Sequence, residues 1–194
     1  MTVLKGLKEL KGGVVILRVL CGGELVSYYL RGRNYRELGE PVVGEVLDHV
    51  IDGIIRADEE YRAEKKALSL LSYADNNQAT MYRKLVLAGF AKDISKEVTE
   101  EMVRLGYINE REQVERLVKT AANTKLLGRA VIIPKLCAKG YSPSLVREVL
   151  DTLIAMGEIS FSDNKKRLIE TKLGDSPDME EVKKLLYKYG YSSF

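Results

Sequence analysis

The feature that most constrains the fold of this chain is an internal repeat with a period of about 50 residues. Residues 84–90 recur as residues 135–141, 51 positions later, and again as residues 185–191. Identical residues also occur at the same offset of 51 between these anchors: Val98/Val149, Gly106/Gly157, Ile108/Ile159, Arg116/Arg167 and Leu117/Leu168. Agreement at one fixed offset over so many apolar and glycine positions indicates tandem copies of one structural unit.

Each complete copy is predicted to form three short helices. In the first copy Ile94, Val98 and Met102 follow each other at intervals of four, as on one buried face of a helix. The predicted helices cover about residues 60–72, 77–88 and 93–105, then 109–122, 126–139 and 142–156. The glycines that follow them, at positions 89, 106, 140 and 157, suit left-handed C-terminal caps.

A third copy begins at Ser160, contains a predicted helix start at Ser176-Pro177, and is truncated before its third helix. A unit of this size has a small core, so stacking on neighbouring units must supply much of its stability. The sequence therefore predicts a mainly α protein with tandem three-helix repeats in an elongated array. The predicted boundaries place the repeats at 59–106 and 107–157, and the partial repeat at 158–194.

Residues 1–58 have a different character and are predicted to form a β-hairpin followed by a helix. The β-branched, apolar residues 14–20 and the similar residues 25–30 flank Gly22-Gly23, a pattern typical of a hairpin. After Pro41, apolar residues recur every four positions, which predicts a helix that begins near residue 42: Val42, Val46, Val50 and Ile54. A lone hairpin is marginally stable, so it should pack on a helix or a partner.

Composition excludes several classes of protein. The chain has 194 residues, of which 45% are apolar and 30% charged, and it contains no apolar run of 18 residues. We therefore expect a cytoplasmic monomer that makes no contact with a membrane. A single histidine, His49, and two distant cysteines, Cys21 and Cys137, offer no metal-ligand cluster. Because the sequence also lacks a glycine-rich phosphate loop, we expect no catalytic residues, no cofactor and no enzymatic activity.

Basic residues are concentrated in the middle of the chain, although the net charge is only +3. Residues 124–174 hold nine basic and five acidic residues, which suggests that this region contacts a polyanion or an acidic protein surface. The candidate partner-binding residues are Arg129, Lys135, Lys139, Arg147, Lys165, Lys166 and Arg167. The alternative interpretation is that these side chains lie on solvated helix faces without a binding role. Acidic clusters such as Asp58-Glu59-Glu60 and Glu100-Glu101 are interpreted as helix surface.

The order and spacing of the repeat motifs resemble the RecX family of bacterial recombination regulators. The resemblance rests on segments 66–73, 82–85, 89–90 and 105–110, on Lys135-Leu136 with Lys139-Gly140-Tyr141, and on Leu185-Leu186 with Gly190-Tyr191. It covers residues 14–194, including the N-terminal hairpin and helix. The chain departs from the family at Gln113 and Leu117, where the family usually has phenylalanine.

The resemblance implies a non-enzymatic protein that binds the RecA recombinase. Members of the RecX family lie along the helical groove of the RecA–DNA filament, hinder its growth and suppress its ATPase and strand-exchange activities. They act in DNA repair, recombination and the SOS response. A slender array of repeats would suit such a partner, because it could contact several subunits at once.

A DNA-binding transcriptional regulator is the alternative function, with each three-helix unit acting like a helix-turn-helix. A net charge of +3 is low for such a protein, and the predicted helices do not concentrate arginine, asparagine and glutamine for base contacts. Weak contact with DNA is compatible with either function. DNA binding that falls steeply with salt would favour the alternative, whereas retention that depends on RecA would favour the first function.

Overall fold

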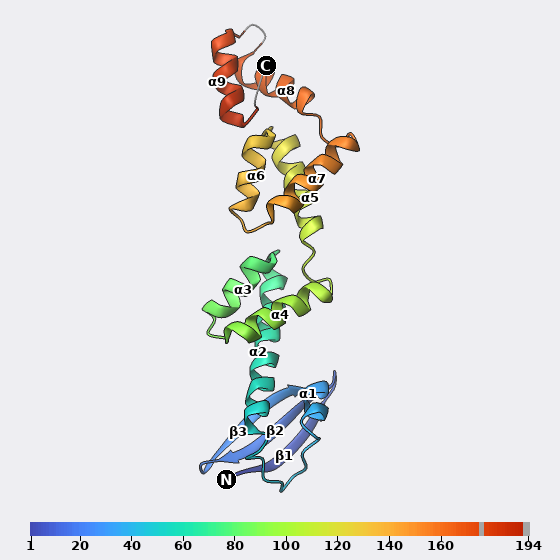
Figure 1. The fold of residues 1–194 in the computed structure, drawn as a ribbon, viewed down its shortest axis with the longest axis vertical. Helices are drawn as coiled ribbons and strands as arrows, with labels where there is room; N and C mark the ends of the chain where they lie inside the picture. Colours follow the sequence, from blue (N-terminus) through green and yellow to red (C-terminus); the bar gives the residue numbers. More distant parts are fainter. Residues whose placement is uncertain (175–176, 192–194) are drawn as a thin grey trace. The chain divides into compact units, whose positions relative to one another are not determined.

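The structure is a computed structural model that describes residues 1–174 and 177–191 (Figure 1). The chain divides into two compact units. Unit 1 contains Met1–Ala74 and Met81–Arg104, and unit 2 contains Asp75–Thr80 and the chain from Leu105 onward. The described residues form nine α-helices and one three-stranded antiparallel sheet, so the mainly α fold class with a small N-terminal β element is confirmed.

The sheet contains one more strand than the sequence predicted. Its strands are β1 (Thr2–Leu10), β2 (Val14–Cys21) and β3 (Glu24–Arg31), in the order β1-β2-β3. Gly22 and Gly23, both at positive φ, form the two-residue turn between β2 and β3, so the predicted hairpin is present. Strand β1 was missed because a bulge between Leu4 and Gly6 shifts the phase of its apolar alternation.

The prediction of a helix that begins near residue 42 is wrong. The main chain of this segment pairs with the edge of β1 instead: the N–H of Leu4 donates to the Glu45 carbonyl at 3.0 Å, and the N–H of Gly44 donates to the Leu4 carbonyl at 2.8 Å. Gly44 has a φ of 97°, which is incompatible with a helix, and Val42 and Val46 are exposed. The free edge of β1 offers unpaired backbone N–H and C=O groups. Hydrogen bonds to these groups stabilise the extended conformation of the segment more than its four-residue apolar spacing stabilises a helix.

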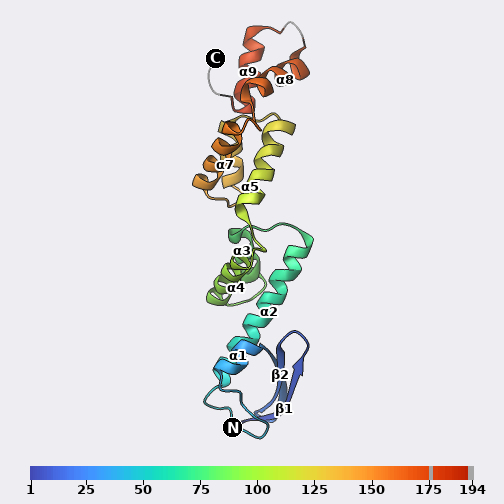
Figure 2. The same ribbon diagram turned by 90° about the vertical axis from the view of Figure 1, so that its right-hand side faces the viewer.

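Two helices follow the sheet, α1 (Gly32–Glu37) and α2 (Ile51–Tyr73), and Figure 2 shows both on one side of it. The first half of α2 buries Ile54 and Ala57 against the sheet in a cluster that also includes Leu4, Val15, Leu17, Val19, Leu30 and Leu47. The second half of α2 buries Ala63 and Ala67. The boundary predicted at residue 58 lies inside this continuous helix, and the boundaries near 106 and 157 stay predictions.

The helices of the repeats reproduce the period of 51 residues. Helices α4 and α7 begin and end 51 positions apart, and the first residues of α3 and α6, and of α5 and α8, are also 51 positions apart. The helices are α3 (Gln78–Leu87), α4 (Lys92–Arg104), α5 (Glu110–Lys119), α6 (Arg129–Cys137), α7 (Pro143–Ala155), α8 (Phe161–Leu173) and α9 (Met179–Tyr189). The predicted left-handed glycines are confirmed, since positions 89, 106, 140 and 157 all have a positive φ.

Two details of the helices differ from the sequence-based expectation. Ser176, part of the predicted helix start Ser176-Pro177, lies outside the described residues, and α9 begins at Met179 with Asp178 as its N-cap residue. Helix α5 continues into a π-helical turn, Thr120–Thr124.

Unit 2 contains two apolar clusters, one formed by α5, α6 and α7 and one between α8 and α9. Gln113, a polar residue, is buried beside the first cluster. Its side-chain oxygen accepts a hydrogen bond from the Tyr141 hydroxyl at 3.0 Å, and its nitrogen donates to the Asn76 carbonyl at 3.3 Å. This buried polar side chain is accommodated because both ends of its amide are paired.

Main-chain groups and glycines join the third repeat to the second. The N–H of Gly128 donates to the Tyr189 carbonyl at 2.7 Å, and the N–H of Ala130 donates to the Gly190 carbonyl at 3.2 Å. A Cβ on Gly190 would lie 2.6 Å from Cγ2 of Val131, so this position has no room for a side chain. We call this contact, formed by residues 128–131 and 189–190, the glycine joint.

A related contact occurs 51 residues earlier within unit 2. The side-chain nitrogen of Asn77 donates to the Lys139 carbonyl at 2.8 Å, and a Cβ on Gly140 would lie 3.1 Å from Cβ of Ala79. Asn77 and Ala79 correspond to Gly128 and Ala130 at the repeat offset. Residues at the same position of the repeat therefore hold two turns, the one after α6 and the one after α9.

Tyr191, next to the glycine joint, makes stability depend on pH in the alkaline range. Burial raises its pKa to about 12, and its hydroxyl donates to the Leu126 carbonyl at 3.0 Å. The stabilisation that depends on the protonated phenol is fully present below pH 10 and is lost as the pH rises through about 12.

We expect the wild-type protein to lose about 2 kcal/mol more unfolding free energy than Tyr191→Phe between pH 9 and pH 11.5. Urea unfolding of both proteins at the two pH values measures this difference. Equal losses in the two proteins would contradict it.

Candidate functional site

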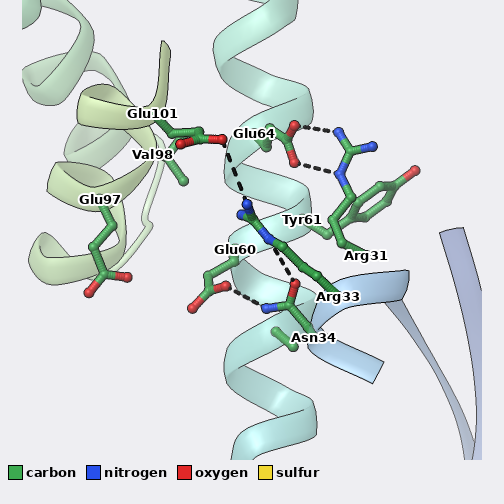
Figure 3. Close-up of a pocket in the computed structure, with 10 residues that line it drawn as sticks. Arg31, Arg33, Asn34, Glu60, Tyr61, Glu64, Glu97, Val98 and Glu101 are labelled. Carbon is green, nitrogen blue, oxygen red and sulfur yellow. Dashed lines mark hydrogen bonds and ion pairs between the residues drawn. The ribbon is translucent and has the colours of Figure 1, made fainter. Parts of the chain in front are cut away.

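A pocket of about 190 Å³ in unit 1 lies between the end of β3, α1, α2 and α4 (Figure 3). We call it the α2–α4 pocket. It is lined by Arg31, Arg33, Asn34, Ala57, Glu60, Tyr61, Glu64, Glu97, Val98 and Glu101. Glu60 and Glu64 are four residues apart on α2, and Glu97 and Glu101 are four apart on α4, so each pair lies on one face of its helix.

Basic and amide side chains from β3 and α1 pair with three of these four glutamates. The guanidinium of Arg31 binds both carboxylate oxygens of Glu64, with 2.8 Å between its Nε and Oε2. The side-chain nitrogen of Asn34 donates to Glu60 at 2.9 Å, and Arg33 forms an ion pair with Glu101 at 3.6 Å. These contacts hold α1 and β3 against α2 and α4.

Two further arginines complete the network at the rim of the pocket. A hydrogen bond from Arg104, together with the charges of Arg104 and Arg33, lowers the pKa of the Glu101 carboxyl. Arg56 binds Asp93 at 2.5 Å and Glu97 at 2.8 Å, so α2 and α4 are also linked on the solvent side. The carboxylates of the pocket are thus paired with arginine or amide side chains, which suits a structural network better than proton transfer.

Unit 2 has a smaller pocket at the corresponding place in its own repeat, between α5 and α7. It measures about 180 Å³ and is lined by Arg111, Glu115, Val149, Thr152, Leu153, Met156 and Glu158. Arg111 stands where the first repeat has Glu60, and Thr152 stands where it has Glu101. A pocket therefore occurs at the same position of both repeats, but its charged residues differ. The two pockets would not bind the same ligand.

The acidic clusters are helix surface only in part: Glu100 is exposed as expected, but Asp58, Glu60 and Glu101 are not. Asp58 is buried: one oxygen accepts the N–H of Tyr29 at 2.7 Å, and the other pairs with Arg62 at 2.8 Å. Glu60 and Glu101 are half-buried in the α2–α4 pocket. The four-residue spacing of glutamates on two facing helices was the signal that could have indicated this arrangement. Across residues 1–174 and 177–191, histidine, cysteine and acidic side chains form no cluster of three or more that could hold a metal ion.

The predicted partner-binding residues are distributed over α6, the turn that follows it, α7 and α8 of unit 2. Arg129 pairs with Asp151, and Nζ of Lys165 lies 5.7 Å from the centre of the Tyr191 ring. The others are exposed and form no ion pair with a described residue: Lys135, Lys139, Arg147, Lys166 and Arg167. Their role in binding a partner stays a prediction.

The architecture defines a helical-repeat protein with an N-terminal antiparallel sheet. It is similar to a solved structure described as regulatory protein RecX, with a TM-score of 0.76 and 18% identity over 99% of this chain and 95% of that chain. The resemblance to RecX is therefore confirmed at the level of the fold.

Other comparisons add little to this result. A solved RecX from Lactobacillus salivarius aligns with 69% of this chain and 97% of its own, at 19% identity and a TM-score of 0.48. No protein-family model and no curated protein matches the sequence. None of the helices in the described residues has the length and apolar character needed to cross a membrane.

Proposed function

We propose that this chain is a RecX-type regulator that binds the RecA–DNA filament in its groove and inhibits filament growth, ATP hydrolysis and strand exchange. The observation that carries the proposal is the match of nearly the whole chain to a RecX fold. The order of the repeat motifs, which points to the same family independently of the fold, supports it. In this function the protein has no catalytic role and acts from the cytoplasm as a monomer.

The unpaired basic residues of unit 2 are the proposed contacts with RecA. Lys135 and Lys139 are four positions apart near the end of α6, and Lys166 and Arg167 are exposed on α8. Exposed cations without an internal partner can form ion pairs with an acidic protein surface without breaking existing ones. Arg129 and Lys165, which already contact Asp151 and Tyr191, would have to change partners first.

The test is a titration of this protein into RecA of the same organism during ATP hydrolysis on single-stranded DNA, at one fixed salt concentration. We expect hydrolysis to fall progressively as the protein approaches stoichiometry with RecA, and the protein to co-sediment with the filament. An unchanged rate at stoichiometric excess would overturn the proposal. Salt-sensitive binding to duplex DNA without any effect on RecA would favour the transcriptional regulator instead.

The double variant Lys135→Ala/Lys139→Ala should weaken this inhibition. Two exposed ion pairs together contribute about 1.4 kcal/mol to the free energy of binding. About tenfold more of the variant should therefore be needed for half-inhibition. Lys92→Ala/Lys96→Ala, which removes two exposed lysines with the same spacing from α4, is the matched control and should inhibit like the wild type. Equal inhibition by both variants would show that α6 does not contact RecA.

A further inference from the structure

Most of one face of the N-terminal sheet is exposed, and α2 reaches it at the edge strand β3, where Tyr61 stacks on Tyr29. Ile54 and Ala57 of α2 pack on the face formed by Val15, Leu17 and Val19, and Figure 2 shows α1 and α2 on that side. The strand pairing places the alternate residues of β2 and their partners on the other face, which we call the outer sheet face. Its residues include Gly6, Lys8, Leu10, Ile16, Arg18, Leu20, Leu25, Ser27 and Tyr29.

The outer sheet face is positively charged. Lys8 and Arg18 are both exposed, and neither forms an ion pair with a described residue. The acidic residues of the strands, Glu9 and Glu24, pair with Val15 and Cys21 and therefore belong to the opposite face. Because these strand carboxylates lie on the opposite face, the two exposed cations favour an anionic ligand.

Both cations line one hollow on the sheet. It has a volume of about 270 Å³ and is lined by Gly6, Leu7, Lys8, Ile16 and Arg18. Gly6 follows the bulge of β1, and a Cβ there would lie 3.5 Å from both Cβ and Cδ of Arg18. The absence of a side chain at position 6 leaves the hollow open beside the arginine.

An aromatic ring lies in the same row of the sheet as one of these cations. Lys8, Ile16 and Tyr29 pair with one another across the three strands. The Tyr29 side chain is 37% exposed, and its ring is stacked on Tyr61, with 6.0 Å between the centroids and 10° between the planes. A fixed, partly exposed ring next to unpaired cations matches the combination that binds single strands, in which phosphates meet cations and bases stack on aromatic rings.

We propose that the outer sheet face binds single-stranded nucleic acid, with phosphates at Lys8 and Arg18 and a base on Tyr29. The aromatic ring favours this ligand over an acidic peptide, because a peptide carboxylate would gain nothing from a tyrosine face. This site is separate from the proposed RecA contacts on α6 and α8, and its test needs no RecA.

The experiment measures fluorescence anisotropy of a labelled 12-nucleotide oligothymidine titrated with the full chain. Lys8→Ala/Arg18→Ala should bind at least tenfold more weakly, and the slope of log affinity against log salt should become shallower by about 1.4 for the two lost phosphate contacts. Lys92→Ala/Lys96→Ala removes the same charge from α4 and should bind like the wild type. Unfolding curves of each variant confirm that the sheet is intact.

Tyr29→Leu tests the stacking step separately from charge. This variant keeps an apolar side chain but removes the ring, so binding should weaken about tenfold while the salt slope stays the same. Undiminished binding by Lys8→Ala/Arg18→Ala would overturn the proposal. Competition by poly-glutamate as strong as that by unlabelled oligothymidine would overturn it too, because it would identify an acidic protein as the ligand.

Discussion

Gly190→Ala is expected to lower the free energy of unfolding by about 3 kcal/mol. Gly190 has a left-handed conformation with a φ of 83°, which costs an alanine about 1–2 kcal/mol. Its new Cβ would also lie 2.6 Å from Cγ2 and 2.7 Å from the backbone nitrogen of Val131, and such overpacking costs about 1–3 kcal/mol. Urea unfolding gives the total loss, and hydrogen exchange should show faster opening of α8 and α9.

Gly89→Ala is the matched control for this prediction. Gly89 occupies the same place in the first repeat and has a φ of 96°, but a Cβ there meets no atom within 4 Å. The Gly89→Ala variant should lose about 1 kcal/mol of unfolding free energy, from backbone strain alone. Gly128→Ala provides the converse test, because its φ of −86° is ordinary while its Cβ would overlap the Gly190 carbonyl oxygen. Similar losses for Gly89→Ala and Gly190→Ala would show that the glycine joint is not close-packed.

Asp58→Leu is expected to cost about 2–3 kcal/mol and to loosen the contact between the sheet and α2. The Asp58 side chain is 6% exposed and accepts the N–H of Tyr29 in the edge strand β3. Leucine has a similar size but cannot accept this hydrogen bond, so the part-buried N–H of Tyr29 would lose its partner. Urea unfolding and the exchange rate of the Tyr29 amide proton measure the two effects.

Asp58→Asn separates the hydrogen bond from the charge. Its amide oxygen can still accept the N–H of Tyr29, while the ion pair with the largely exposed Arg62 is lost. An ion pair with an exposed partner contributes little to stability, so Asp58→Asn should lower the free energy of unfolding by less than about 1 kcal/mol. If Asn and Leu were equally destabilising, the ion pair and not the strand contact would be the important interaction.

The repeat could be predicted because its signal is local and occurs more than once. The equivalent glycines and the apolar positions of α4 and α7 carry the 51-residue offset in the sequence itself. Strand β1 and the segment after Pro41 could not be predicted in the same way. Their structure depends on pairing with each other, and neither the bulge at Gly6 nor the edge of β1 is visible in residue spacing.

The candidate sites were less predictable than the fold for a related reason. The α2–α4 pocket combines β3, α1, α2 and α4, so its glutamates and arginines become neighbours only in the folded chain. The outer sheet face likewise depends on the register of three strands. In contrast, the basic residues of unit 2 were found by counting charge, which cannot show that Arg129 already pairs with Asp151.

The glycine joint has a consequence for how such a chain can diverge. Its hydrogen bonds run between main-chain groups, so most side chains around it can change without breaking them. The sequence can then change extensively while the fold is retained, provided that small residues remain at positions such as 128 and 190. Copies of such a repeat can therefore acquire different surface residues independently of one another. The main-chain contacts that join them stay the same.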